Sequence, residues 1–331
     1  MSPNNSKIRV GITCGDPNGI GLEALADALS DDRTMAHIVP IVYAPRELAV
    51  KAFDNVPWGE VEDEAAAESG QINLVSFEAE EFEHKPGEAS QQAGAVAMES
   101  LQRAVAQLAK TNVDVLVTAP INKDTIRSAG FNFPGHTEYL ASEAGVEDVL
   151  MLLCCDGRRI GVAAGHVALK EVSTELTSAK IVTKLKLMHE SLVRDFGIPS
   201  PRIAVLGLNP HAGDNGNFGT EEIEIIQPAV NKLQSEQVNV DGPWPSDTVF
   251  LKAKAGEVDG IITMYHDQGQ IALKLMGFDR GVTVQGGIPF PVTTPAHGTA
   301  FDISGTGKAD VKAMQAAFSI ACNMVSNWQA R

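Results

Sequence analysis

Three histidines of this chain follow short apolar segments that are typical of buried strands. They are His166, His211 and His266. In open α/β sheets, ligands collect at the carboxyl ends of the strands. One histidine in such a place is usually structural, but three in the same local context predict a metal site. Imidazole is the commonest metal ligand, and three imidazoles leave coordination positions open for substrate or water. Nitrogen ligation favours zinc, with cobalt, nickel or iron(II) as alternatives.

Other polar residues lie near the third histidine and could assist it. Asp267 could support His266 from a second layer, although neighbours in a strand face opposite ways. The segment His266–Gly269 predicts a tight turn, and a helix bearing Lys274 is expected from Gln270. A lysine suits a phosphate or carboxylate, although spacing alone favours a surface position for this one.

Two further candidates lie in turns framed by glycine or proline. Asp247 follows a proline-rich turn and is either a general base or a simple turn acid. His136 precedes a segment with helical character, and we expect Thr137 to cap that helix with His136 just outside it. From position alone, each of these residues has a structural alternative to its catalytic or binding role.

The elements that would carry these residues alternate between strands and helices, which predicts an α/β fold with a mainly parallel sheet. The first strand is expected at 8–13, and a long helix at 89–110 precedes a strand at 114–118. Asp156-Gly157 predicts a hairpin turn between two strands. The acidic stretch 54–90 is interpreted as a solvated excursion that contains a hairpin with a strand at 72–77.

Composition narrows the function. With 331 residues, the chain is long enough for two domains or one large α/β unit. A net charge of −16 argues against nucleic acid as a partner. The first residues lack the apolar core of a signal peptide, and no apolar run is long enough to span a membrane. The four cysteines form no C-x-x-C pair, so we expect reduced thiols and a cytoplasmic location.

Several blocks of the sequence, taken in order, resemble the 4-hydroxythreonine-4-phosphate dehydrogenase family. The blocks are Gly15-Asp16-Pro17-Asn18-Gly19-Ile20-Gly21, Thr118-Ala119-Pro120-Ile121-Asn122-Lys123, Gly135-His136-Thr137-Glu138, Asn209-Pro210-His211-Ala212-Gly213, Met264-Tyr265-His266-Asp267-Gln268-Gly269 and His297-Gly298-Thr299-Ala300. The segment from His297 to Gly305 is also similar to the adenine-side cofactor loop of isocitrate and isopropylmalate dehydrogenases. The resemblance covers residues 8 to 325.

The resemblance implies a fold of two α/β domains with a central cleft, in a homodimer. It places a cofactor-side domain at 1–128 plus 283–331, and a metal, substrate and dimerisation domain at 129–282. It also implies the chemistry: NAD or NADP takes a hydride from the hydroxyl carbon of a phosphorylated hydroxy acid. The resulting β-keto acid then loses carbon dioxide.

The resemblance assigns roles residue by residue. His166, His211 and His266 match ligands of a divalent metal shared across the dimer interface, with zinc, cobalt and magnesium among the candidates. His136, Thr137, Lys274 and Thr283 fall at substrate-binding positions. The cofactor-binding positions are His297, Gly298, Thr299, Ala300 and Asp302. The general base that takes the hydroxyl proton is assigned here to Asp247.

Two of the substrate positions depart from the family pattern. Thr283 stands where the family has asparagine, and Val292 stands where it has arginine. Losing an arginine removes a bidentate grip on an anion. We therefore keep three substrate classes open: 4-phosphohydroxy-L-threonine, a threonate or erythronate phosphate, and an unphosphorylated hydroxy acid. Two other classes of protein are a metal-dependent hydrolase and a non-catalytic binding protein. The adenine-type loop argues against the hydrolase.

Overall fold

The chain divides into two compact units. The computed structural model describes residues 7–79, 82–133 and 135–331. One unit comprises Met1–Gly145 and Pro289–Gln329, and the other comprises Val146–Ile288 with Ala330–Arg331. The boundaries therefore fall at 145/146 and 288/289, where the sequence-based expectation was 128/129 and 282/283. The start of the chain, where no signal peptide was expected, lies outside the described residues.

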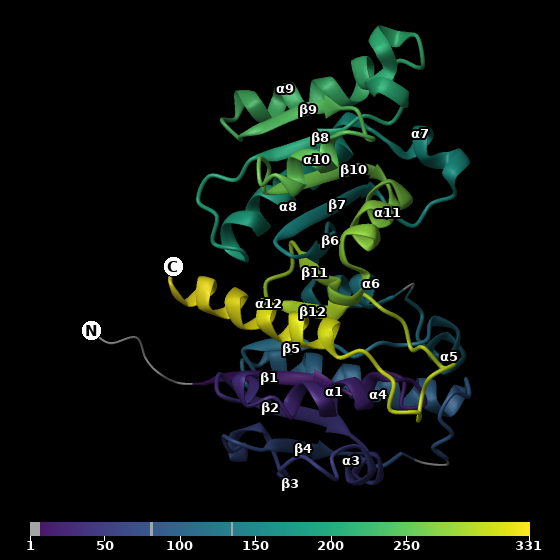
Figure 1. Cartoon of the computed structure of the whole chain (residues 1–331), viewed down its shortest axis with the longest axis vertical. Coiled ribbons are helices and arrows are strands. Elements are labelled where there is room, and N and C mark those ends of the chain that lie inside the picture. The colour runs from purple at the N-terminus through teal and green to yellow at the C-terminus, as the bar shows by residue number, and fades with distance from the viewer. Residues whose placement is uncertain (1–6, 80–81, 134) are drawn as a thin grey trace. The chain divides into compact units, whose positions relative to one another are not determined.

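The first unit contains a parallel sheet with the strand order β3-β4-β2-β1-β5-β12 (Figure 1). Its strands are β1 (Ile8–Thr13), β2 (Ile38–Ala44), β3 (Trp58–Glu60), β4 (Ile72–Ser76), β5 (Val115–Val117) and β12 (Val292–Pro295). Its helices are α1 (Gly21–Leu29), α2 (Asp32–Met35), α3 (Arg46–Ala52), η1 (Glu64–Ala66), α4 (Gln91–Ala109), α5 (Lys123–Ser128), α6 (His136–Ala144) and α12 (Lys312–Gln329). The strands read as nearly continuous apolar runs because both faces of a parallel sheet are covered.

The acidic stretch 54–90 belongs to the edge of this sheet. Strand β4 pairs in parallel with both β2 and β3, so the predicted hairpin is wrong. Ile72 and Leu74 are fully buried. Glu64 is also buried and accepts a hydrogen bond from the Tyr43 hydroxyl at 3.0 Å. Part of the stretch that was predicted to be solvated is therefore buried at the edge of this sheet.

The second unit contains a mixed sheet with the order β11-β6-β7-β10-β8-β9. Its strands are β6 (Leu150–Cys155), β7 (Arg158–Ala164), β8 (Ile203–Leu206), β9 (Val240–Trp244), β10 (Gly260–Tyr265) and β11 (Val282–Gly286). Strands β6 and β7 are antiparallel and joined at Asp156-Gly157, as predicted. Strands β7, β10, β8 and β9 run parallel to one another.

The helices of the second unit cover this sheet, and α8 begins at a side-chain cap. They are η2 (Leu169–Glu171), α7 (Val172–Glu175), α8 (Ser178–Arg194), η3 (Pro210–Gly216), η4 (Glu222–Ile226), α9 (Gln227–Ser235), α10 (Val249–Lys254), α11 (His266–Gly277) and η5 (Phe278–Arg280). The hydroxyl of Thr177 accepts from the Lys180 amide at 3.2 Å and so satisfies one free N–H at the start of α8. A core of aliphatic side chains, including Ile160, Leu206 and Ile261, fills the space beneath these helices.

None of the helices among the described residues is long and apolar enough to cross a membrane.

Candidate active site

The order of strands in the second unit explains why two of the histidines meet. Strand β10 lies between β7 and β8 and is parallel to both, so the carboxyl ends of all three strands lie on one edge of the sheet. His166 follows β7, and His266 follows β10 directly. Their ring centroids are 5.8 Å apart.

His266 is the first residue of α11 rather than part of a loop. Tyr265 is the N-cap, so the tight turn predicted for His266–Gly269 is wrong and those residues form the first turn of the helix. Because the strand ends at Tyr265, the expected opposite orientation of His266 and Asp267 does not arise. Nδ1 of His266 lies 2.7 Å from Oδ1 of Asp267, which orients the ring and leaves Nε2 for another partner.

His211 lies in a loop whose backbone is held in the left-handed region. Its φ is 53°, and Ala212 has φ 52°, Asp214 φ 43° and Asn215 φ 55°. Left-handed geometry costs a residue with a Cβ roughly 1–2 kcal/mol, and it rarely continues over successive residues. Other contacts must therefore hold this loop in place.

The buried carboxylate of Glu222 supplies those contacts. Its Oε1 accepts hydrogen bonds from the backbone amides of Leu208 and Asn209, both at 2.7 Å. Its Oε2 accepts from Nδ2 of Asn209 at 3.0 Å. Glu222 is only 3% exposed, and a Cβ added at Gly213 would lie 2.6 Å from its Oε2. The carboxylate thus fills the concavity of the loop that carries His211.

Within the described ranges, no group of three or more His, Cys, Asp or Glu side chains is arranged to hold a metal ion. Two of the three expected ligands, His166 and His266, are brought together. The third, His211, lies with its ring centroid 6.1 Å from that of Phe218.

Three more of the expected site residues belong to the same unit. Asp247 is exposed in the turn between β9 and α10. Lys274 is exposed on α11, and its Nζ lies 5.9 Å from the ring centroid of Phe278. Thr283 is partly exposed on β11 and pairs with Leu153 of β6.

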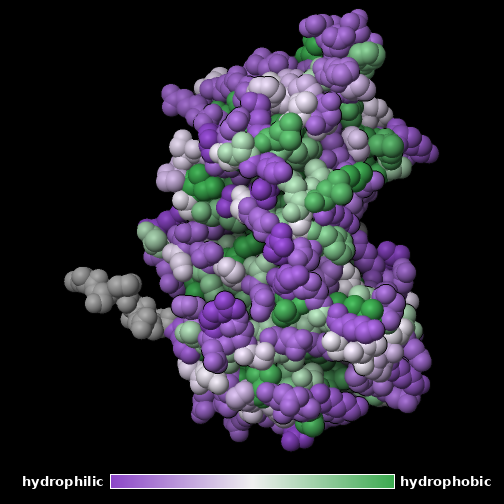
Figure 2. Space-filling model, in the orientation of Figure 1, coloured by the Kyte–Doolittle hydropathy of each residue, from purple (hydrophilic) through white to green (hydrophobic). Residues whose placement is uncertain are grey.

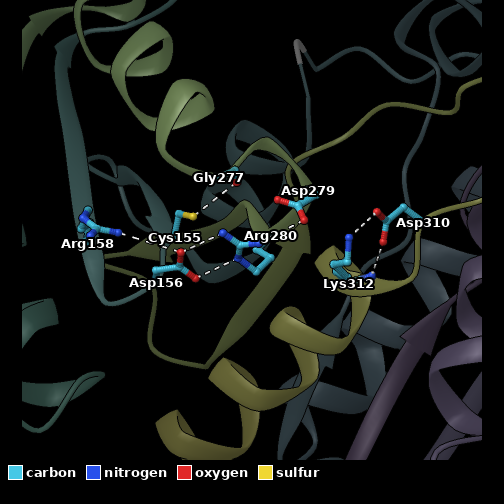
Figure 3. Close-up of polar contacts among 8 residues, drawn as sticks. All are labelled: Cys155, Asp156, Arg158, Gly277, Asp279, Arg280, Asp310 and Lys312. Carbon is cyan, nitrogen blue, oxygen red and sulfur yellow. Dashed lines mark hydrogen bonds and ion pairs between the residues drawn. The ribbon is translucent and has the colours of Figure 1, made fainter. Parts of the chain in front are cut away.

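A polar cluster anchors the end of α11 to the turn between β6 and β7 (Figure 3). Arg280 donates from Nε and Nη2 to the two carboxylate oxygens of Asp156, each at 3.0 Å. The thiol of Cys155 donates to the Gly277 carbonyl at 3.3 Å. These contacts fix the C-terminal end of α11, and they therefore restrict the movement of Lys274, which lies in the last turn of that helix.

In the first unit, His136 and Thr137 are the first two residues of α6. The N-cap is Gly135, which offers no side-chain cap, so the prediction that Thr137 caps the helix from outside is wrong. Nε2 of His136 is buried and has no hydrogen-bond partner among the described residues. Burial, assisted by the Lys123 ammonium and opposed by Glu138, lowers the pKa of His136 to about 4. The ring is therefore neutral near pH 7.

The segment expected to bind the cofactor also belongs to the first unit. His297 directs Nδ1 at the Gly298 carbonyl, 2.9 Å away, while its Nε2 is buried without a hydrogen-bond partner in the described part of the chain. Thr299 is buried, and Ala300 has a left-handed φ of 43°. Asp302 is exposed.

The glycine-rich turn between β1 and α1 supports this segment. The Ile20 amide donates to the Thr299 carbonyl at 2.9 Å, and a Cβ on Gly19 would lie 2.9 Å from that same oxygen. One carboxylate oxygen of Glu23 accepts from the Gly305 amide. The turn therefore packs against the predicted cofactor segment, and close approach of the Thr299 backbone explains the glycine at position 19.

Glu222 and Glu23 cannot be singled out from the sequence. Both are glutamates within helical segments, and nothing in their local pattern separates them from surface acids. Only the long-range contacts identify them. Val292, which stands at the family's arginine position, is fully buried on β12 and pairs with Leu116 of β5.

Comparisons with known proteins agree on one class. A relative from Bacteroides thetaiotaomicron named 4-hydroxythreonine-4-phosphate dehydrogenase is 38% identical over 329 residues, covering 98% of this chain and 90% of that protein. A D-threonate 4-phosphate dehydrogenase from Pectobacterium atrosepticum is 38% identical over 328 residues, covering 96% of this chain and 99% of the relative. The crystal structure of a 4-hydroxythreonine-4-phosphate dehydrogenase from Klebsiella pneumoniae superposes with a TM-score of 0.86 at 36% identity, covering 98% and 99% of the two chains.

The α/β fold and these relatives define the chain as an oxidoreductase of the dehydrogenase class, for which a nicotinamide cofactor is implied. A family model described as pyridoxal phosphate biosynthetic protein PdxA matches residues 34–321. The chain therefore belongs to the PdxA family, and the resemblance inferred from the sequence blocks is confirmed.

Proposed function

We propose that this chain is an NAD- or NADP-dependent, divalent-metal-dependent dehydrogenase of a phosphorylated four-carbon hydroxy acid. Its hydroxyl carbon gives up a hydride, and the resulting β-keto acid loses carbon dioxide. The substrate we favour is 4-phosphohydroxy-L-threonine, because relatives that align over nearly the whole chain carry that activity in their names. The observation that carries the proposal is the pairing of His166 with His266 at the ends of parallel strands in a chain of this family.

The donor set fits a divalent cation. His166 and His266 offer imidazole nitrogens from rings 5.8 Å apart, and Asp267 occupies Nδ1 of His266 so that Nε2 is directed elsewhere. A bound cation acts as a Lewis acid toward the oxygens of the reacting substrate. Zinc suits an all-nitrogen set, and cobalt is an alternative. Magnesium prefers oxygen ligands and stays a candidate only through the family resemblance.

The remaining positions would hold and orient the substrate. His136 and Thr137 lie at the start of α6, where free backbone N–H groups and the positive end of the helix dipole favour an anionic group. The His136 ring is neutral and its Nε2 has no hydrogen-bond partner among the residues that the structure describes, so it can share a hydrogen bond with a substrate oxygen. Lys274 supplies a cation, and Thr283 a hydroxyl. Asp247 is exposed to solvent and would take the hydroxyl proton as hydride leaves.

The segment from His297 to Asp302 would bind the adenosine side of NAD or NADP. Its backbone is fixed by Thr299 on the turn between β1 and α1, so the segment is prepared before the cofactor arrives. The exposed carboxylate of Asp302 can accept hydrogen bonds from ribose hydroxyls. A hydrolase would have no use for such a loop, which favours the dehydrogenase over that class.

We further propose a cytoplasmic homodimer in which a second copy completes the metal site. The outer face of α11 carries Ile271, Leu275 and, just beyond it, Phe278, which are 60%, 84% and 60% exposed. Figure 2 shows hydrophobic side chains gathered on the surface over α10 and α11. An apolar stripe of this kind on the helix that begins at His266 supports burial against another chain. The described residues also hold no three-ligand group within one chain.

A second substrate class is supported by two residues. Val292 is buried and cannot pair with a phosphate or carboxylate, and Thr283 offers a hydroxyl where the family has an amide. The Pectobacterium relative, with D-threonate 4-phosphate in its name, is as similar to this chain as the Bacteroides relative. A threonate or erythronate phosphate is therefore the alternative substrate, and an unphosphorylated hydroxy acid is a third.

A turnover assay tests the proposal. The purified protein is loaded with zinc, cobalt or magnesium and supplied with NAD or NADP and each acid in turn, and the absorbance of reduced nicotinamide is followed. We expect reduction with a phosphorylated four-carbon acid, together with release of carbon dioxide. Metal uptake without reduction of either cofactor by any of these acids would overturn the dehydrogenase proposal.

A further inference from the structure

The side chain of Gln268 uses all of its ordinary hydrogen-bonding groups within the second unit. Gln268 lies in the first turn of α11, two residues beyond His266. Its Oε1 accepts from the Met264 amide at 2.7 Å. Its Nε2 donates to the Gly207 carbonyl at 2.8 Å and to the Ser246 hydroxyl oxygen at 2.7 Å. Ser246 in turn donates to the Gly207 carbonyl at 3.3 Å.

Each of these contacts reaches a segment that carries a candidate site residue. Gly207 follows β8 and begins the backbone path to His211. Ser246 immediately precedes Asp247 in the chain. The Gln268 amide therefore connects three segments. They are the helix that starts at His266, the loop that carries His211 and the turn that carries Asp247.

The chemistry of an amide suits this task. It offers two donors and an acceptor in one plane, and here the acceptor faces a backbone N–H while the donors face oxygens. Only this orientation of the amide satisfies all of the contacts. A carboxylate of the same shape has no N–H to donate, so it would set negative oxygen against the Gly207 carbonyl.

We propose that Gln268 is a positioning residue, which holds the His211 loop and the Asp247 turn in register with His266. The inference rests on the proposed function, because it assumes that these three residues act in one site. The side-chain hydrogen bonds of Gln268 go to Met264, Gly207 and Ser246, none of which is a candidate catalytic or metal-binding residue. Gln268 acts through Gly207 and Ser246, whose distances from its Nε2 are those of good hydrogen bonds.

The matched test compares Gln268→Glu with Gln234→Glu. Nε2 of Gln234 also donates to a backbone carbonyl, that of Val240 at 2.9 Å, but it joins α9 to β9 away from the candidate residues. Both substitutions exchange an amide for a carboxylate of equal size and remove an N–H donor. For Gln268→Glu we expect kcat to fall about 10- to 100-fold with a smaller change in KM, because misplaced catalytic groups cost rate. Gln234→Glu should retain the kcat of the unmodified chain.

Metal affinity provides a readout that does not depend on turnover. Zinc is titrated into the metal-free protein by calorimetry, and Gln268→Glu should bind about 10- to 100-fold more weakly, as for losses of support behind a metal ligand. Ser246→Ala removes one of the contacts with little risk to folding, and it should lower kcat in the same direction by a smaller factor.

The two kinds of failure are distinguishable. If Gln268→Glu and Ser246→Ala keep both kcat and zinc affinity while only the melting temperature falls, Gln268 is structural and the inference is overturned, although the dehydrogenase proposal stands. If Gln268→Glu does not fold, Ser246→Ala decides the matter by the same two measurements. If the unmodified chain reduces no cofactor, the zinc titration still tests Gln268 by itself.

Discussion

Replacing Glu222 with alanine should release the loop that carries His211. The carboxylate accepts hydrogen bonds from two backbone amides and one side-chain amide, all within 3.0 Å. Hydrogen bonds to a charged group each contribute about 1.5–3 kcal/mol, so the anchor is worth about 5–9 kcal/mol in total. Against it stands the left-handed strain of His211 and Ala212, about 2–4 kcal/mol, because the loop's other left-handed residues with a Cβ, Asp214 and Asn215, are of types that adopt this region at little cost.

The loop can relax once the anchor is gone, and relaxation recovers the strain. We therefore expect Glu222→Ala to lower the free energy of unfolding by about 3–5 kcal/mol, a large part of the 5–15 kcal/mol that is usual for a folded domain. Zinc affinity should fall as well, because His211 would sample many positions. The free energy of unfolding of Glu222→Gln should lie between those of the unmodified chain and Glu222→Ala, since the amide oxygen can still accept from the backbone amides.

Denaturant unfolding at fixed protein concentration measures the stability, and calorimetric titration measures the zinc affinity. Glu224→Ala is the control, because Glu224 is exposed in the same short helix. A loss below about 1 kcal/mol for Glu222→Ala, close to that of the control, would show that the carboxylate does not hold the loop and would refute the reasoning.

Three further predictions concern separate parts of the site. Because burial lowers the pKa of His136 to about 4, from its ordinary value of 6.5, the unfolded chain binds more protons between these values. Stability should therefore be full above about pH 6.5 and fall as the pH drops toward 4, and unfolding curves of His136→Gln should show a weaker dependence over that window. Gly213→Ala should lower both stability and zinc affinity, because its Cβ would lie 2.6 Å from the Glu222 carboxylate at a φ of 80°; an unchanged melting temperature would contradict this. Asp267→Asn should weaken zinc binding about 10- to 100-fold by removing the charge behind His266, and calorimetry that shows equal affinity would count against that support.

Local pattern determined much of this fold in advance. The strand predicted at 8–13 has those bounds in the structure, because Ile8, Val10, Ile12 and Thr13 are β-branched residues that favour strands and a glycine-rich turn ends it. The turn at Asp156-Gly157 is likewise readable, since both residues take positive φ, 47° and 77°, as tight hairpins require. The positions of the three histidines after strands also follow from the sequence, because strand and exit are neighbours in the chain.

Tertiary structure decided what depends on distant partners. The acidic stretch before β4 joins a parallel sheet, and no local signal distinguishes that from a hairpin. No loop separates β10 from α11, so His266 is the first residue of a helix instead of part of a turn. The left-handed loop of His211 exists because the Glu222 carboxylate, on a later helix, satisfies its amides. Gln268 finds its acceptor at Gly207, 61 residues earlier. Spacing along a chain encodes the periodicity of one element, whereas these contacts depend on how separate elements pack, which periodicity alone does not specify.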